Sequence, residues 1–344
     1  MNHVNEIHAG GGTDINSGIN LALKTIRERK FVNKVTSIFL LSDGQDGGAD
    51  YRVQESLNMP VNKELEVFSI HSFGFGTDHD EELMTNICKF RDGTFYFIKE
   101  LATLDEAFCN ALGGIISLVA KEVNIKLTNI SKNLVGGIQI GKVYGDMWEK
   151  LNQKEYRIKI SQLMSGISKD YVFEMSIPHI DAEVGDIDRD HEVLEGNFIA
   201  KGIDNQNISG ECFLRLTLLN ENEEIPEINE NVEVIENYLR VKASDAIEEN
   251  MKKADQQKYE EAQKGIDDMI NYIQSNKKAR KDKMEYLVND LQNVKSKCSK
   301  KDWEFEGRKH MKNAKEAHFA QKNFQYSNAV QAEMVSKRKA AKKM

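Results

Sequence analysis

Two side chains that could bind a metal ion stand at the ends of two patterned segments. Thr13 lies in the glycine-rich stretch Gly10–Leu23, and Asp43 follows the apolar run that begins at Ser37. A threonine hydroxyl and an aspartate carboxylate offer hard oxygen ligands, which suit Mg²⁺. Thr13 and Asp43 are therefore the first residues to consider as a functional site.

The segments next to these residues predict a helix and a strand. The run Val35–Leu41 is short, apolar and bounded by Asp-Gly, which is typical of a strand buried on both faces. Ligands of open α/β sheets bind at the carboxyl ends of the strands, so Thr13 and Asp43 are expected at one edge of a parallel sheet. The residues at helical spacing are Ile15, Ile19, Ala22, Leu23 and Ile26.

Strands and helices continue to alternate along the N-terminal third of the chain. Strands are predicted at Leu65–Gly76 and Thr94–Ile98, with a helix over Asp80–Phe90 between them. The capping-box pattern Thr103-x-x-Glu106 predicts the start of a further helix. This order is typical of a doubly wound parallel sheet. The apolar face of the last helix is predicted to hold Phe108, Leu112, Ile115, Ile116 and Val119.

Two of these motifs closely resemble the von Willebrand factor type A (vWA) domain. Gly-Gly-Thr-Asp-Ile at 11–15 and Leu-Leu-Ser-Asp-Gly-Gln-Asp at 40–46 are similar to the second and third segments of that family. There, the threonine and the aspartate help to hold a divalent cation, usually magnesium, in a metal-ion-dependent adhesion site. The resemblance implies that Thr13 and Asp43 are metal ligands and that an acidic group of a protein partner completes the site.

The first segment of the family motif, Asp-x-Ser-x-Ser, has no counterpart here. Only Met1–Ala9 precede the glycines, and they contain no such pattern. We therefore expect residues 1–120 to form a partial vWA domain that lacks its first strand and leaves the edge of the Asp43 strand uncovered. Such an edge is an aggregation hazard. Either the chain is a fragment, or another segment or chain covers that edge.

The missing motif also limits the metal site. With at most two of five expected ligands, Thr13 and Asp43 are expected to bind Mg²⁺ at millimolar affinity or more weakly, or not at all. In the alternative interpretation Thr13 caps the helix that begins near Ile15, and Asp43 with Gly44 only turns the chain. The acidic residues near Asp80 are interpreted as stabilising a helix N-terminus.

Composition predicts a cytoplasmic protein without a membrane span. The 344 residues are 40% hydrophobic, and no signal-peptide pattern and no apolar run of about 18 residues occurs. The four cysteines are far apart, which argues against a zinc site and a disulfide framework. Residues 1–229 carry a formal charge of −14 and residues 230–344 carry +6. The acidic part argues against nucleic-acid binding, and the lysine-rich end is interpreted as a solvated helix end.

Residues 121–229 are predicted to form an antiparallel β-sandwich. Short alternating runs are separated by Asn, Gly, Ser and Asp. Lys142–Asp146 and Ser168–Glu174 resemble the β domain that follows the vWA domain in a family of intracellular eukaryotic proteins. Some plant members carry a RING domain and act as ubiquitin ligases, but no RING cysteine pattern occurs here. The predicted strands are Val123–Leu127, Ile138–Ile140, Tyr156–Ile160, Val172–Ile177 and Phe213–Leu218.

The remainder is predicted to be helical. Residues 230–298 carry three apolar stripes, typical of a helical hairpin or bundle with coiled-coil-like pairing. Docking of a partner helix on these stripes is the alternative. Residues 299–344 are predicted to be a charged tail that forms a long, loosely attached helix.

These patterns favour a non-enzymatic scaffold that binds protein partners through a vWA domain with a degenerate adhesion site. Binding is expected to depend more on the sandwich and on partly exposed stripes between Ile235 and Ile273 than on Thr13 and Asp43. The alternative function is a subunit or fragment of a vWA-type ubiquitin ligase without its zinc module. No catalytic residue is predicted, because no histidine accompanies a Gly-x-Ser-x-Gly or reactive-cysteine motif.

Overall fold

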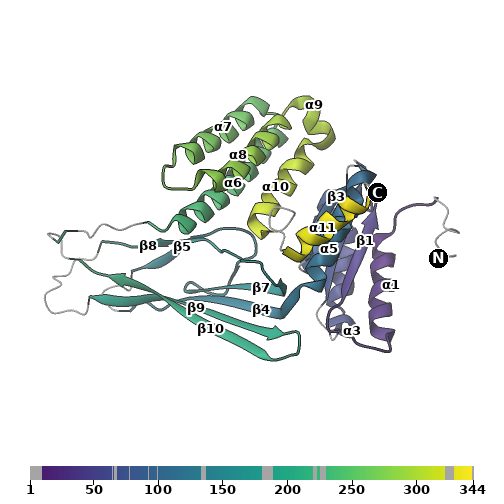
Figure 1. Cartoon of the computed structure of the whole chain (residues 1–344), viewed down its shortest axis with the longest axis horizontal. Helices are drawn as coiled ribbons and strands as arrows, with labels where there is room; N and C mark the ends of the chain where they lie inside the picture. Colours follow the sequence, from purple (N-terminus) through teal and green to yellow (C-terminus); the bar gives the residue numbers. More distant parts are fainter. Residues whose placement is uncertain are drawn as a thin grey trace. The chain divides into compact units, whose positions relative to one another are not determined.

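The computed structural model (Figure 1) forms two units that are described here separately. The first comprises Met1–Val119, Ser161–Ser165 and Asn328–Met344, and the second comprises Ala120–Ile160 and Gly166–Ser327. The structure describes residues 10–63, 65, 68–76, 78–91, 93–98, 100–132, 137–179, 189–219, 223–224, 230–321 and 329–342.

A three-stranded parallel sheet forms the centre of the first unit. Its order is β1-β2-β3, with Ser37 opposite Ser69 and Ser72 opposite Phe95. Helices alternate with these strands, which confirms the predicted α/β class. The elements are α1 (Ile15–Glu28), β1 (Ser37–Ser42), α2 (Ala49–Asn58), α3 (Pro60–Lys63), β2 (Ser69–Phe75), α4 (Glu81–Phe90), β3 (Phe95–Ile98) and α5 (Leu101–Ile116).

Strand β1 lies at the edge of this sheet. Among the described residues, it pairs with β2 on one side and with no strand on the other. Five of its six residues are half-buried or exposed, and Leu41 is 48% exposed. The prediction of a strand buried on both faces holds in part: Ile38 and Leu40 pack against one core and Phe39 against another, but all three are only half-buried. The expectation that the sheet lacks its first strand stays a prediction, because residues 1–9 lie outside the described residues.

Helix α1 is capped by Asp14, not by Thr13. The Asp14 carboxylate accepts hydrogen bonds from the main-chain N–H of Ser17 at 2.9 Å and from its hydroxyl at 2.6 Å. The alternative interpretation that Thr13 is the cap is thus wrong by one residue. At α4, the Asp80 carboxylate accepts from the N–H of Leu83, and two glutamates occupy the first turn. This arrangement stabilises the positive end of the helix, as predicted.

Helix α5 begins before the predicted capping box. Its first residue is Leu101, so Thr103 lies inside the first turn, where its hydroxyl donates to the carbonyl of Glu100. The predicted apolar face is wrong at Leu112, Ile116 and Val119, which are 42%, 69% and 43% exposed. Phe108 packs toward the sheet as predicted, together with Leu104, Ala107 and Ala111.

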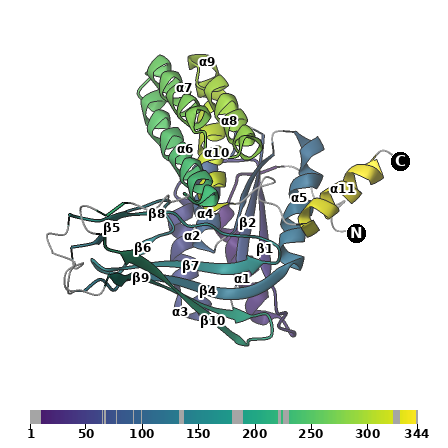
Figure 2. The ribbon, with the colours of Figure 1, turned by 60° about the vertical axis from the view of Figure 1, so that its left-hand side comes forward.

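The end of the chain packs on α5. Helix α11 (Ala329–Lys342) lies beside α5 in both ribbon views (Figures 1 and 2). Gln331 donates to the side-chain oxygen of Asn110 at 2.6 Å, and Arg338 pairs with Asp105 at 2.8 Å. A Cβ atom on Gly113 would lie 2.8 Å from the Cα of Gln331. The expectation of one long, loosely attached tail helix is therefore corrected.

Two antiparallel sheets form the β part of the second unit. The larger has the order β10-β9-β4-β7-β6 and the smaller pairs β5 with β8. Leu127 and Tyr156 of the larger sheet share a core with Ile140 of the smaller, which confirms a sandwich-like packing. The strands are β4 (Leu118–Asn129), β5 (Gln139–Val143), β6 (Glu149–Lys150), β7 (Glu155–Met164), β8 (Phe173–Ser176), β9 (Asp190–Gly202) and β10 (Asn207–Thr217).

Strand β9 was not predicted. Its pairing with β10 shifts where Leu214 lies opposite Leu194 and Arg215 lies opposite Glu192. Val193 is the extra residue of this bulge, and both Val193 and Leu194 are buried. Two successive buried residues break the alternation that a regular strand shows, which explains why the pattern was missed.

A helical bundle completes the second unit (Figure 2). Its stripes are buried in one core, with Leu239, Ile266 and Leu287 all 0% exposed. The predicted bundle packing is observed, and the stripes are not exposed for a partner helix. Met311 of the predicted tail also lies in this core. The elements are α6 (Val232–Asp255), α7 (Tyr259–Ser275), α8 (Lys281–Ser296), α9 (Lys300–Asp302), a π-helical turn (Trp303–Gly307) and α10 (Arg308–Ala320).

Arg240 of α6 joins three parts of the second unit. This buried guanidinium donates to the main-chain carbonyl of His318 in α10 and, at 2.9 Å, to that of Asp170 between β7 and β8. Near the start of α6, the side chain of Glu236 accepts the main-chain N–H of Arg280 and two of its guanidinium hydrogen bonds. Buried charges of this kind fix the relative position of the segments that they join.

No helix in the described part of the chain is long and apolar enough to span a membrane.

Candidate metal-binding edge of the parallel sheet

Thr13 lies against the loop that carries Asp43, at the carboxyl edge of the parallel sheet. Asp43 directly follows β1, and Thr13 precedes α1. A Cβ atom on Gly44 would lie only 2.3 Å from Oγ1 of Thr13, so the threonine hydroxyl lies directly against the residue after Asp43. The structure thus brings the loops of the two predicted residues together at the edge where α/β sheets bind ligands.

Asp46 holds the two loops of this edge together, and the sequence did not single it out. One carboxylate oxygen accepts the first main-chain N–H of α1, that of Ile15, at 2.9 Å. The other pairs with Arg52 of α2 at 2.5 Å. Asp46 therefore satisfies a helix N-terminus and fixes the loop that carries Asp43. The spacing Asp-Gly-Gln-Asp was the signal that could have identified it.

The loop after β2 borders the same edge. The N–H of Asp80 donates to the carbonyl of Gly44 at 3.4 Å. The ring of the buried His79 packs against the backbone of Gly74 at the end of β2, where a Cβ atom would lie 2.4 Å from the ring. His79 also contacts the rings of Phe95 and Phe97 in β3. Histidine at this position therefore serves the packing of the sheet edge.

The carboxylates near Thr13 already accept hydrogen bonds from the protein. Asp14 and Asp80 cap helices, and Asp46 binds a main-chain N–H and an arginine. The hydroxyl and N–H of Ser17 lower the pKa of Asp14 below its ordinary value. Within the described residues, no group of three or more His, Cys, Asp or Glu side chains could hold a metal ion. Thr13 and the exposed Asp43 are the residues that would hold Mg²⁺, with waters or a partner supplying the other oxygens.

A serine–histidine contact lies at the other end of the strands. Ser69 is fully buried at the start of β2, and its Oγ lies 3.1 Å from Nε2 of His71. The N–H of Thr94 donates to Nδ1 of the same ring at 3.2 Å, so the ring proton is on Nε2. Nε2 then donates to the serine and cannot accept its proton. This geometry stabilises the strand pairing and does not activate the hydroxyl as a nucleophile.

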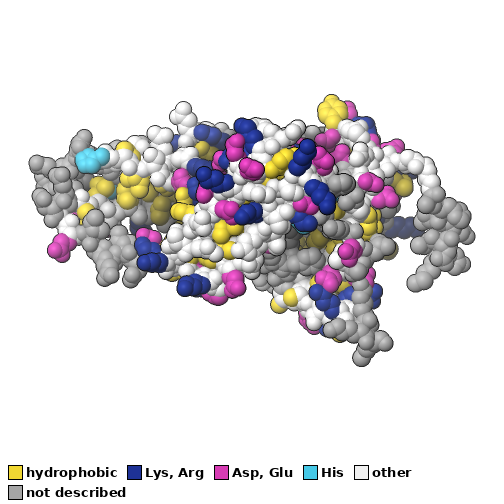
Figure 3. Space-filling view, turned by 90° about the horizontal axis from the view of Figure 1, so that it is seen from above, with side chains coloured by type: hydrophobic (Ala, Val, Ile, Leu, Met, Phe, Trp, Pro, Cys, Tyr) yellow, Lys and Arg dark blue, Asp and Glu magenta, His cyan; other side chains and the backbone are white. Residues whose placement is uncertain are grey.

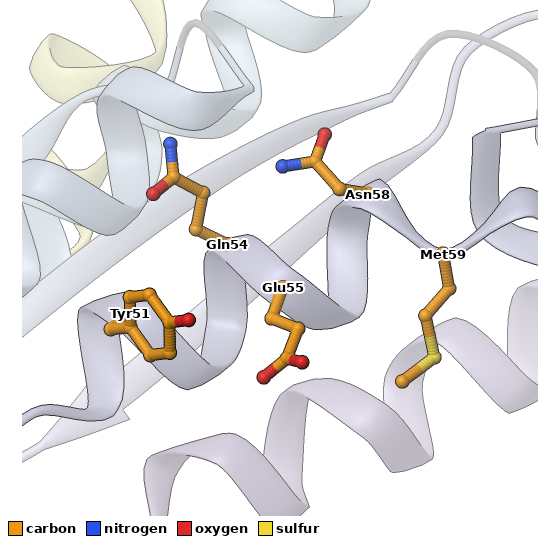
Figure 4. A pocket seen from close by; sticks show the side chains of 5 residues that line it. All are labelled: Tyr51, Gln54, Glu55, Asn58 and Met59. Carbon is orange, nitrogen blue, oxygen red and sulfur yellow. The ribbon is translucent and has the colours of Figure 1, made fainter.

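A depression of about 400 Å³ lies on α2 and is lined by residues of that helix and its C-cap (Figure 4). Tyr51 is 69% exposed and Met59 is 47% exposed, so this is an open surface. Among the described residues, its lining contains one carboxylate, that of Glu55, and no histidine or cysteine. The depression therefore offers no acid–base pair for catalysis.

Comparison with solved structures gives the class of fold. A von Willebrand factor type A protein from Catenulispora acidiphila matches with a TM-score of 0.53 and 16% identity, over 85% of this chain and 65% of that one. The chain thus spans about two thirds of that protein's length. At this identity the match shows the fold alone: the chain has the α/β fold of vWA proteins.

Two further structures match more weakly. The ArnB paralog VWA2 from Sulfolobus acidocaldarius has a TM-score of 0.46 and 14% identity, over 91% of this chain and 70% of that one. The human COPII-coat protein Sec24c has a TM-score of 0.47 and 9% identity, over 93% of this chain and 42% of that one. No protein-family model and no curated protein matches the sequence.

Proposed function

We propose that this chain is a non-enzymatic protein-interaction scaffold whose vWA fold carries a degenerate metal-ion-dependent adhesion site. The observation that supports this proposal is the contact of Thr13 with the loop of Asp43, in a setting where the neighbouring carboxylates bind main-chain N–H groups. Two oxygen ligands retain a preferred position for Mg²⁺, but they provide only a small part of its octahedral shell.

Weak metal binding shifts recognition to direct protein contacts. A partner carboxylate bound through Mg²⁺ at this edge adds little affinity if the ion itself binds at millimolar concentration. The apolar stripes of α6 and α7 are buried in their own bundle, so exposed residues outside them contact the partner. On the face shown in Figure 3, acidic and basic side chains are intermingled, which suits protein contacts better than a polyanion.

A magnesium titration tests the metal part of the proposal. In 1 mM MgCl₂ the melting temperature of the wild-type chain should rise by less than about 3 °C. The reason is that metal binding raises the unfolding free energy by only about 0.4 kcal/mol when the ion concentration equals Kd. Asp43→Asn and Thr13→Val should remove this small shift, and Glu55→Gln on the exposed face of α2 should keep it. A rise of several degrees that Asp43→Asn abolishes would show a competent site and refute the degenerate one.

A capture experiment tests the interaction part. The immobilised wild-type chain and the Thr13→Val/Asp43→Asn double variant should retain the same proteins from a cell extract, with and without Mg²⁺. Loss of these proteins from the double variant alone would place recognition at the metal edge. Turnover of a substrate by the purified chain, including ubiquitin transfer, would refute the non-enzymatic assignment.

A further inference from the structure

Strand β10 is an unusually exposed sheet edge. It is the outermost strand of the five-stranded sheet (Figure 1), and among the described residues it pairs with β9 alone. Ten of its eleven residues are exposed, and they include Ile208, Phe213 and Leu214 at 42–46% exposure. Long exposed edges are normally protected by charged side chains, especially lysine, by proline, by a bulged edge strand or by a covering segment. β10 contains neither proline nor lysine, and the bulge of this hairpin lies in β9.

The alternation along β10 sorts its side chains into two faces. Leu194 of β9 is buried in the sandwich core and lies opposite Leu214, so even-numbered residues of β10 point to the core side. Cys212 belongs to this apolar row. The odd-numbered residues point to the solvent side, where Glu211 and Arg215 carry opposite charges on either side of Phe213.

The sequence of β10 is complementary to itself in an antiparallel direction. A two-fold axis that passes through Phe213 and is perpendicular to the sheet places residues whose numbers add to 426 opposite each other. Glu211 of each copy then lies opposite Arg215 of the other copy, so this pair occurs twice per dimer. Phe213 lies opposite Phe213 of the second copy. The other pairs are Ser209 with Thr217, Gly210 with Leu216, and Cys212 with Leu214.

Other registers match less well. An axis through Glu211 places two carboxylates directly opposite each other, which is unfavourable. An axis through Gly210 places Glu211 opposite Ser209 of the second copy. Arg215 then has no residue of β10 opposite it. Arg215 already hydrogen-bonds Glu192 of β9, which holds the guanidinium on the solvent face while 70% of its side chain stays exposed. The axis through Phe213 is the one that pairs all charges of the strand's central segment.

We propose that the chain forms a homodimer through antiparallel pairing of β10 with β10 of a second copy, centred on Phe213. The five-stranded sheets of the two copies then form one continuous sheet. The apolar rows of the two β10 strands, which contain Ile208, Cys212 and Leu214, lie next to each other. This interface is independent of the metal edge and of the proposed scaffold function. Isologous interfaces of this kind close on themselves and do not propagate into fibres.

Charge reversal tests both the dimer and its register. The wild-type chain is examined by sedimentation up to about 100 µM, a concentration that detects weak interfaces. Glu211→Arg places arginine opposite Arg215 of the partner copy, and Arg215→Glu places glutamate opposite Glu211. Each variant should raise the dimer Kd by about 10-fold or more, because two cross-strand pairs become repulsive.

A mixture of the two variants provides the decisive result. An equimolar mixture of Glu211→Arg and Arg215→Glu should form a heterodimer, because every charged pair across the interface is again of opposite sign. Glu149→Arg is the matched control: it removes an exposed ion pair with Arg157 at the opposite edge of the same sheet and should leave dimerisation unchanged. Circular dichroism establishes that each variant is folded. A monomeric wild-type chain, unchanged single variants or a monomeric mixture would each overturn the proposal.

Discussion

The contact between Thr13 and Gly44 predicts a strong coupling between two small substitutions. In Gly44→Ala the new Cβ would lie 2.3 Å from Oγ1 of Thr13, 3.4 Å from its Cβ and 3.8 Å from its Cγ2. Only the hydroxyl therefore clashes, and it must move by about 1 Å to reach an ordinary contact distance. The φ angle of Gly44 is not in the left-handed region, so alanine is compatible with the backbone.

The loss of unfolding free energy in Gly44→Ala follows from this geometry. Overpacking of a well-packed site costs about 1–3 kcal/mol, and Thr13 is only half-buried, so we expect about 1–2 kcal/mol for Gly44→Ala. Thr13→Ala removes the clashing oxygen and should cost less than about 1 kcal/mol by itself. The double variant should then be as stable as Thr13→Ala, with a coupling energy of about 1–2 kcal/mol. Gly12→Ala in the same loop has no atom within 4 Å of the new Cβ and is the matched control.

Hydrogen exchange is the appropriate assay for this cycle. Both tryptophans, Trp148 and Trp303, lie in the second unit, so fluorescence does not report on the first. Exchange of the β1 and β2 amides at increasing urea gives the unfolding free energy of the first unit. Additive effects of Gly44→Ala and Thr13→Ala would show that the hydroxyl is not at this position. The metal-binding edge as described would then be refuted.

Two further predictions concern the second unit, whose tryptophans Trp148 and Trp303 report on urea unfolding. Arg240→Met should lower the unfolding free energy by about 1–3 kcal/mol, and Arg240→Lys by a smaller amount, because the buried carbonyl of His318 loses a charged donor. The carbonyl of Asp170 keeps its hydrogen bond from Gln321. A loss below about 1 kcal/mol would contradict the joining role of Arg240. Hydrogen bonds from Arg280 lower the pKa of Glu236, so its stabilisation is complete above the unfolded-state pKa and is lost as the pH falls through the folded-state pKa. Glu236→Gln should therefore lower the unfolding free energy by about 1 kcal/mol at pH 7 and by almost nothing below about pH 3. An equal loss at both pH values would refute this explanation.

Glu236 stabilises the folded chain mainly in its ionised form. The carboxylate form of Glu236 accepts three hydrogen bonds from Arg280, so it is favoured in the folded state. An unfolded chain lacks these bonds and binds the proton more tightly than the folded chain. Stability therefore rises with pH across this range.

The sequence by itself determined the local elements and the place of the predicted metal ligands. The spacing of Ile15, Ile19 and Leu23 defined the buried face of α1, and all three side chains are buried. Thr13 and Asp43 were placed at one edge of a parallel sheet, and the structure brings their loops together. These features can be predicted from short segments of sequence, because apolar spacing and turn residues define a helix or strand within a few residues. Metal binding by the two residues stays a prediction.

Tertiary structure decided what these elements pack against. The apolar pattern of β1 does not specify which strand lies beside it, and among the described residues only β2 pairs with it. Residues of the predicted tail enter the bundle through Met311 and pack on α5 through Gln331. Arg240 and Asp46 likewise bond residues that are far apart in the chain, and β10 is an edge strand because β9 pairs with β4 on its other side. Such contacts gain their free energy from burial and hydrogen bonding between distant segments, which no local pattern of residues contains.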